Sequence, residues 1–298
     1  MSESNESMRR KIKGANSIKS VVRTMKAIAS SNINEYEKAV SALDEYYNAT
    51  KMSLVAYFRE NKPDIHNLHP EKLKTDKKII GAIVFGADQG LVGQFNDAIA
   101  AYAIKELSSY NSKIEIWAVG EGVYESLTEA GFPVEGRFKV PNSVRAITPL
   151  VGDILMESEV RINRNEIAEF HIFYNKNSQE MIYEPVHKRL LPLDEIWMKE
   201  FIDLPWPTIC IPEVIGDTKK TLFSLIHEYI FAAVFRACAE SLAAENASRL
   251  ATAERADKNI GELLENLGRS YQELRQSTID EEMFDIVSCF EIVSKHKK

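Results

Sequence analysis

A glycine-rich stretch is the part of the sequence most similar to a phosphate-binding turn. It runs from Gly86 to Gly93 (GADQGLVG), after an apolar run typical of a strand and before an amphipathic run typical of a helix. Backbone N–H groups at such a helix start can bind phosphate. The spacing is neither GxGxxG nor GxxxxGK[ST], and no lysine follows Gly93. A tight turn that needs glycine geometry is therefore favoured, and a nucleotide site is the alternative.

Residue types used in nucleophilic and metal-assisted catalysis are present, but their spacing does not assemble a site. The sequence has no GxSxG elbow and no HExxH pair. His171 falls in an apolar run and is expected to be a hydrogen-bonded core histidine. Glu281 and Glu282 are adjacent, so on a helix they point about 100° apart and do not form a catalytic pair. We predict no catalytic residue, no metal site and no cofactor.

Composition excludes several classes of protein. The chain has 298 residues, 45% of them hydrophobic, and a net charge of −7, which argues against a nucleic-acid binder. No apolar run approaches the roughly 20 residues of a bilayer span, and the polar start MSESNESMRRK predicts no signal peptide. Cys210, Cys238 and Cys289 have no CxxC spacing, so we expect reduced thiols packed as small core residues.

A basic cluster near the N-terminus stands out in this acidic chain. Two interpretations are open: a solvated helix face, or an electropositive patch that faces an acidic partner. Its members are Arg9, Arg10, Lys11, Lys13, Lys19, Arg23 and Lys26.

The elements that position these residues follow from the uneven distribution of glycine and proline. Neither residue occurs between Gly14 and Pro63, and no proline follows Pro212. Apolar residues in both outer segments recur at steps of three and four, which predicts two very long helices. The N-terminal stripe is Val22, Met25, Ala29, Ile33, Tyr36, Val40, Leu43 and Tyr47; the C-terminal stripe is Ile260, Leu264, Leu267, Tyr271 and Leu274, then Ile279, Met283, Ile286, Phe290 and Val293.

Two exposed apolar stripes of similar character are expected to bury each other in an antiparallel helix pair. At about 1.5 Å per residue, a C-terminal helix of about 80 residues from Thr218 would reach roughly 120 Å. The N-terminal helix is shorter, so the C-terminal one should project alone at its end. An apolar tip of that kind needs a sleeve supplied by another protein.

The middle of the chain is predicted to be a layered α/β domain. Strands are expected at Lys78–Phe85, Lys113–Val119 and Glu169–Tyr174, with an antiparallel edge strand at Glu180–Val186. Helices are expected near Gln94–Ser108, after Gly120 and over Val144–Val160. This alternation indicates a small Rossmann-like domain over residues 63–216, between helices at 1–62 and 217–298.

Motifs in this order resemble the γ subunit of F-type ATP synthases along essentially the whole chain. The run from Arg23 to Ser31 (RTMKAIASS), after Arg10-Lys11-Ile12, is similar to the basic neck of the family's shaft. Asp88–Asn96 (DQGLVGQFN) is similar to its D-R-G-L-C-G-x-L-N turn, and Leu190–Leu193 to its LLPL. Further matches are Glu245 to Leu250 (E-x-x-A-R-M) and Asn259 (T-D-N). Near the C-terminus they are Tyr271, Arg275, Gln276 and Ile279 (Y-N-x-A-R-Q-x-x-I-T), then Glu282, Asp285, Ile286 and Val287 in the terminal signature.

The resemblance implies a non-catalytic central-stalk rotor that couples ion translocation through a membrane c-ring to ATP chemistry in an α3β3 ring. The ε subunit and the c-ring would bind the middle domain and the lower coiled coil, at the cytoplasmic face of the membrane. The chain itself would bind no nucleotide and no nucleic acid, and it would not span the membrane directly. The residues implied in partner contact are Arg23, Met25, Lys26, Arg249, Arg275, Gln276, Ile279, Met283 and Ile286.

The sequence departs from the family pattern at several positions. Gln89 and Val92 replace the arginine and cysteine of the turn, and Asp280 replaces a threonine. Cys289, Phe290 and Glu291 replace small residues at the tip, where a buried unpaired carboxylate would cost several kcal/mol. The segments from Ser20 to Ala27 and from Gly93 to Asn96 are similar to the alternate, N-type branch. A coiled-coil adaptor without rotation and a nucleotide-binding enzyme are the competing hypotheses.

Overall fold

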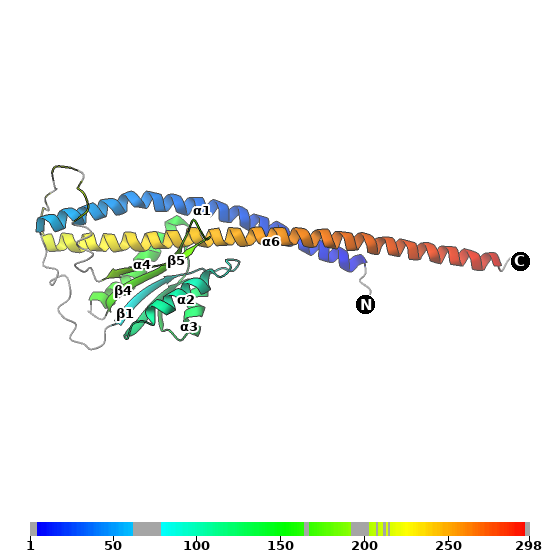
Figure 1. The fold of residues 1–298 in the computed structure, drawn as a ribbon, viewed down its shortest axis with the longest axis horizontal. Coiled ribbons are helices and arrows are strands. Elements are labelled where there is room, and N and C mark those ends of the chain that lie inside the picture. The colour runs from blue at the N-terminus through cyan, green and yellow to red at the C-terminus, as the bar shows by residue number, and fades with distance from the viewer. Residues whose placement is uncertain are drawn as a thin grey trace. The chain divides into compact units, whose positions relative to one another are not determined.

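The computed structural model describes residues 5–61, 79–163, 167–191 and 203–295, except 207, 211–212 and 214. Within these, the side chains of 61, 159–163, 168 and 289–295 lie outside the description. The described residues form a five-stranded sheet with helices on both faces, and a very long helix at each end of the chain (Figure 1). This confirms the predicted fold class.

The bounds of the elements are as follows. The helices are α1 (Asn5–Asn61), α2 (Phe95–Leu107), α3 (Glu121–Glu129), the 3-10 turn η2 (Val144–Ala146), α4 (Ile147–Asn163) and α6 (Thr218–Lys295). The strands are β1 (Ile79–Phe85), β2 (Lys113–Val119), β3 (Val134–Phe138), β4 (Ile167–Lys176) and β5 (Glu184–Leu191).

The sheet has the strand order β3-β2-β1-β4-β5. Its first four strands run parallel, and β5 pairs with β4 in the antiparallel direction. The central strand β1 is apolar throughout because helices cover both of its faces. Three strands match the prediction to within a few residues, and the predicted antiparallel edge strand is present but lies at Glu184–Leu191, four to five residues later than expected. Strand β3 was not predicted.

Alternate residues of β1 point into two separate cores. Ile80, Ala82 and Val84 pack with α2 and α3 on one face. Ile83 and Phe85 pack with α4, α1 and α6 on the other face. Figure 1 shows the same arrangement, with α2 and α3 across the sheet from the two long helices. The period-two alternation of a strand therefore determines which helix each side chain meets.

Helix α6 begins where the sequence predicts and is 78 residues long. The carboxylate of Asp217 caps its start, because Oδ1 accepts the backbone N–H groups of Lys219 (3.0 Å) and Lys220 (3.2 Å). An aspartate at this position satisfies N–H groups that have no partner inside the helix.

Part of α6 is also apolar enough to cross a membrane by length and composition. Within Thr218–Ser288 an 18-residue window reaches a mean hydropathy of 1.4, and 39% of that window is buried inside the protein. A core helix passes the same test, and α6 contributes Val234, Ala237 and Cys238 to the buried cluster on the sheet. The expectation that nothing approaches a membrane span therefore holds only for uninterrupted apolar runs.

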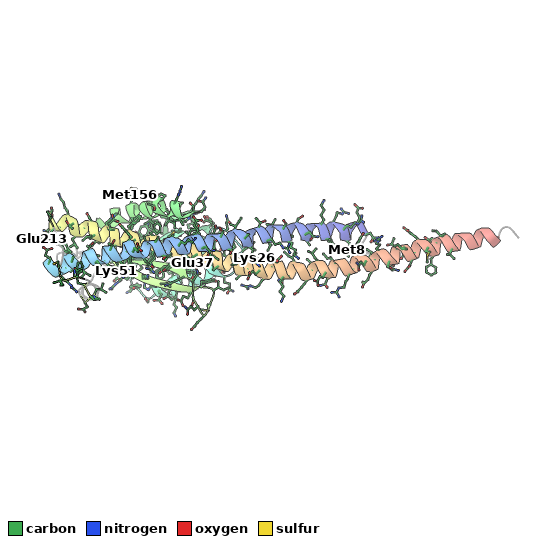
Figure 2. The ribbon with its side chains drawn as sticks, turned by 90° about the horizontal axis from the view of Figure 1, so that it is seen from above. Met8, Lys26, Glu37, Lys51, Met156 and Glu213 are labelled. Atoms are coloured by element: carbon green, nitrogen blue, oxygen red, sulfur yellow. The ribbon has the colours of Figure 1, made fainter. Side chains whose placement is uncertain are left out.

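The chain forms two compact units, which are described separately. The sheet unit is residues 29–249, and the helix-pair unit is residues 1–28 with 250–298. In the sheet unit α1 and α6 run antiparallel: Arg236 pairs with Asp44, and Tyr229 stacks on Tyr47 with ring centroids 5.5 Å apart. Glu37 and Lys51 mark the course of α1 in this unit (Figure 2).

The helix-pair unit contains only the outer parts of the two long helices. They are antiparallel here too, because Arg9 donates to the hydroxyl of Tyr271 (2.8 Å) and Asn5 to that of Thr278 (3.2 Å). Met8, Ala15 and Val22 of α1 are buried at intervals of seven residues. A strict seven-residue repeat is the signature of a coiled-coil seam.

Candidate functional site

The glycine-rich turn after β1 is held by its own aspartate. Oδ1 of Asp88 accepts the backbone N–H of Glu121 (2.8 Å), and Oδ2 accepts that of Val140 (2.9 Å). Glu121 is the first residue of α3, so the aspartate of the turn is bonded to the start of the helix that follows β2 and not to the start of α2.

Asn96 fills the space beside the same turn. Its Oδ1 accepts the backbone N–H of Ala87 (2.7 Å), and its Nδ2 donates to the carbonyl of Ala87 (3.3 Å). A Cβ at Gly122 would lie 2.0 Å from Nδ2 of Asn96, so glycine is required there. These contacts favour the tight-turn interpretation over the nucleotide-site alternative.

The turn also connects the sheet to α6. The hydroxyl of Ser248 donates to the carbonyl of Val92 (2.6 Å), and Phe95 packs against Ala244 in one buried cluster. Next to this contact Leu91 has φ of 61° and is 50% exposed. A non-glycine residue in the left-handed region is uncommon and marks a conformation that the surroundings impose.

Arg249 lies on α6 next to the contact between the turn and this helix, and it forms an ion pair with Glu245 of the same helix. Its side chain is 12% exposed and contacts the Glu245 carboxylate, while Nη1 lies 3.4 Å from Oδ1 of Asn246. Asn246 in turn accepts from Asn32 of α1 (3.3 Å). Burial raises the pKa of the Glu245 carboxyl, and the guanidinium of Arg249 opposes that rise. Arg249 therefore has a structural partner, and its contact with another subunit stays a prediction.

Arg23 and Lys26 lie in the helix-pair unit and face acidic residues of α6. Nε of Arg23 is 3.5 Å from Asp257, and Nζ of Lys26 is 3.1 Å from Glu254. The two cations remain 64% and 41% exposed, and Lys26 is marked in Figure 2. The intervening Met25 is half-buried. Part of the basic cluster therefore forms ion pairs between α1 and α6 of the same chain. Neither interpretation of the sequence included this role.

The predicted apolar tip is exposed in this chain. Ile279, Met283 and Ile286 are 48%, 59% and 69% exposed, and every described side chain from residue 279 to 288 is exposed. Arg275 and Gln276 are exposed just before this stretch. Cys289, Phe290, Glu291 and Val293, which the sequence singled out, lie outside the described side chains.

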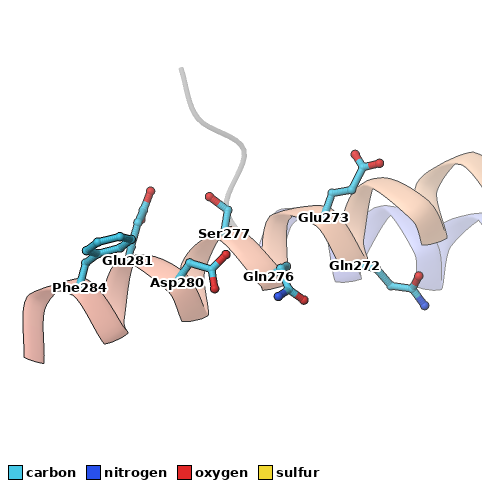
Figure 3. Close-up of a pocket in the computed structure, with 7 residues that line it drawn as sticks. All are labelled: Gln272, Glu273, Gln276, Ser277, Asp280, Glu281 and Phe284. Carbon is cyan, nitrogen blue, oxygen red and sulfur yellow. The ribbon is translucent and has the colours of Figure 1, made fainter. Parts of the chain in front are cut away.

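A shallow surface depression follows one side of α6 next to this stripe. Its lining residues are Gln272, Glu273, Gln276, Ser277, Asp280, Glu281 and Phe284 (Figure 3). All seven belong to one helix, and a single helix face cannot enclose a ligand. The depression is therefore an open face of α6 that carries polar side chains and one aromatic ring.

The histidines and cysteines considered in the sequence analysis do not assemble into a metal or catalytic site among the described residues. Within the described residues, no group of three histidine, cysteine or acidic side chains could hold a metal ion. His171 is buried and hydrogen-bonded, as predicted. Cys238 is buried, and burial raises the pKa of its thiol. Cys210 is exposed, so its predicted core position was wrong: it follows the end of the sheet in a surface segment.

A sequence model of the ATP synthase family matches residues 4–293, almost the whole chain. The chain belongs to the ATP synthase γ-chain family. Curated γ chains from Herminiimonas arsenicoxydans and Pasteurella multocida are 26% and 24% identical to it, over 96% and 94% of this chain and 98% and 96% of theirs. The rotor of the Euglena gracilis mitochondrial ATP synthase shares the fold, with a TM-score of 0.63 at 17% identity, covering 92% of this chain and 98% of that one. The structure thus has the fold of that rotor chain.

Two sequence motifs of the γ-chain family meet where the turn contacts α6. In the family motif from Asp88 to Asn96, Asp88 accepts a hydrogen bond from the start of α3 and Asn96 bonds to Ala87, which follows β1. The carbonyl of Val92 in the same motif accepts the hydroxyl of Ser248 on α6. The motif from Glu245 to Arg249 supplies the buried pair beside it. Sequence reasoning found both motifs but not the contacts that join them.

Proposed function

We propose that this chain is the rotating shaft that couples ion translocation through a membrane c-ring to ATP synthesis and hydrolysis in an α3β3 ring. The observation that carries the proposal is the exposed apolar stripe of α6 at Ile279, Met283 and Ile286, in a chain of the γ family. Apolar side chains in such a row are stabilised by burial against another protein. The chain is non-catalytic in this scheme, and nucleotides bind the ring.

The mechanism rests on asymmetry. One chain inside a ring of three αβ pairs presents a different face to each β subunit. Each β site is then biased toward a different nucleotide affinity, because binding energy differs between the faces. Turning the shaft exchanges these biases, so rotation and ATP chemistry are linked in both directions.

The proposed contacts follow the surfaces described above. Arg23, Met25 and Lys26 face the β levers, and Arg275 and Gln276 face a β loop. The ε subunit and the c-ring bind the sheet unit and the adjoining ends of α1 and α6. The chain is then peripheral, at the cytoplasmic face of a prokaryotic membrane. The c-ring determines which ion is coupled. The segments from Ser20 to Ala27 and from Gly93 to Asn96 support membership of the N-type branch.

Affinity purification from the native cells tests this proposal. A tag on this chain should retrieve α, β, ε and c subunits together. A complex reconstituted without the chain should hydrolyse ATP without ion pumping. Retrieval of an unrelated set of proteins would favour a coiled-coil adaptor, and full ion-driven ATP synthesis without the chain would exclude the rotary role.

A further inference from the structure

Three polar side chains form a hydrogen-bonded row beneath the end of α2. His171 of β4 is 1% exposed; its Nδ1 lies 2.9 Å from Nε2 of His187 on β5, and its Nε2 lies 3.3 Å from Oε2 of Glu169. The ring of His187 stacks on Phe173, with centroids 4.5 Å apart and planes 5° from parallel. Tyr110 lies 5.5 Å from the ring of His171. The two imidazoles are therefore held in one geometry.

The row accepts one proton but not two. Glu169 selects the tautomer in which His171 carries its proton on Nε2, so Nδ1 of His171 accepts from Nε2–H of His187. A first proton can add to Nδ1 of His187 without breaking either bond. A second proton would have to sit on Nδ1 of His171, opposite an N–H group at 2.9 Å, with the two charged rings 5.0 Å apart.

The charges that face the pair come from three elements. Glu169 of β4 and Glu106 of α2 favour a protonated imidazole, whereas Arg189 of β5 disfavours it. Burial is the largest effect and, with His187, lowers the pKa of His171 to about 4; Glu169 opposes it. Burial also lowers the pKa of His187, and Glu106 opposes it. The closed pair is consequently neutral near neutral pH.

We propose that the hydrogen bond between His171 and His187 is an acid-sensitive latch that holds the edge strand β5 on β4. When β5 moves away, both imidazoles meet water and can be protonated. Opening therefore takes up a proton that the closed strand pair excludes. The stabilisation is complete above the ordinary imidazole pKa of about 6.5 and is lost as the pH falls toward the folded value. The latch belongs to the sheet unit alone and does not depend on the rotary role.

Amide hydrogen exchange of the full-length chain tests the latch. Opening should become about tenfold easier for each pH unit below an imidazole pKa of about 6.5, because His171 is protonated only in the open form. Between about pH 7.5 and pH 5, protection of the β5 amides, corrected for intrinsic exchange, should fall about thirtyfold. Protection of the β1 and β2 amides should hardly change. An equal change in all three strands would overturn the proposal.

Two variants separate the pair from general acid effects. In His187→Gln the side-chain amide can donate to His171 or accept from its protonated form, so the part of the decrease that is due to His187 should disappear and the β5 protection should fall less than in the wild type. His227→Gln removes an exposed imidazole of α6 and should keep the full decrease. The same decrease in His187→Gln as in the wild type contradicts the latch. Should His187→Gln not fold, imidazole titration of the wild type by NMR decides: His171 must remain neutral about one pH unit below the ordinary imidazole pKa of about 6.5.

Discussion

Arg249 and Glu245 form a charged pair in a place that excludes water. Their side chains are 12% and 6% exposed, and Nε of Arg249 has no hydrogen-bond partner among the described residues. Such a pair contributes little net stability, but each charge is costly to leave alone. The spacing of four residues on a helix could have indicated this pair from the sequence. Its burial could not, because the covering turn is more than 150 residues away in the chain.

Arg249→Met should therefore lower the free energy of unfolding of the chain by about 3–5 kcal/mol near pH 7. The loss should shrink toward pH 5, because the unpaired Glu245 carboxyl is buried and takes up a proton in the folded state more readily than in the unfolded state. Denaturant unfolding at both pH values measures the change.

An exposed pair provides the control for this substitution. Glu254→Gln removes the partner of Lys26, both more than 40% exposed, and should cost at most about 1 kcal/mol. The double variant Glu245→Leu with Arg249→Met should recover most of the loss. Equal costs for Arg249→Met and Glu254→Gln would mean that Arg249 is not effectively buried.

At the scale of the elements, local sequence patterns predicted the helices and strands whose formation depends on residues near each other in the chain. The apolar runs of β1, β2 and β4 and the apolar stripe of α1 from Val22 onward depend on periodicity alone, and they were predicted. Strand β3 (VEGRF) was missed because its glycine and two charged residues lower its strand signal, and pairing with β2 stabilises it. The bonds of Asp88 to residues 33 and 52 positions away left no local pattern.

The packing of α3 against the turn depends on one glycine. Gly122→Ala would place a methyl group on the side chain of Asn96, which must then give up its two bonds to Ala87. Two net hydrogen bonds and a local rearrangement correspond to about 2–3 kcal/mol of unfolding free energy. Thermal or denaturant unfolding of the variant measures this loss.

Gly152 of α4 is the matched control, because a Cβ there meets nothing within 4 Å. Gly152→Ala should stabilise the chain by about 0.5–1 kcal/mol through helix propensity. If both alanine variants were equally tolerated, Asn96 would not be fixed in the position described.

At the scale of the whole molecule, the two long helices are covered very differently along their length. In the sheet unit, α6 is buried almost continuously from Ala237 to Asn246, because α1 covers one side and the sheet and turn cover another. In the helix-pair unit only Ala253 of α6 is buried among the described residues. A segment with so few buried contacts has low local stability unless a partner covers it.

Hydrogen exchange of the isolated chain should therefore show a steep gradient along α6. Protection should fall by roughly a hundredfold or more from residues 237–246 to residues 279–288, because opening the exposed end breaks few contacts. In the assembled complex the same end should gain protection, since the proposed sleeve buries Ile279, Met283 and Ile286. The residues at 237–246 are already buried within the chain and serve as the internal control. A tip that exchanges equally fast with and without α and β would remove the sleeve from the proposal, and the proposed contacts of the sheet unit with ε and the c-ring would still stand.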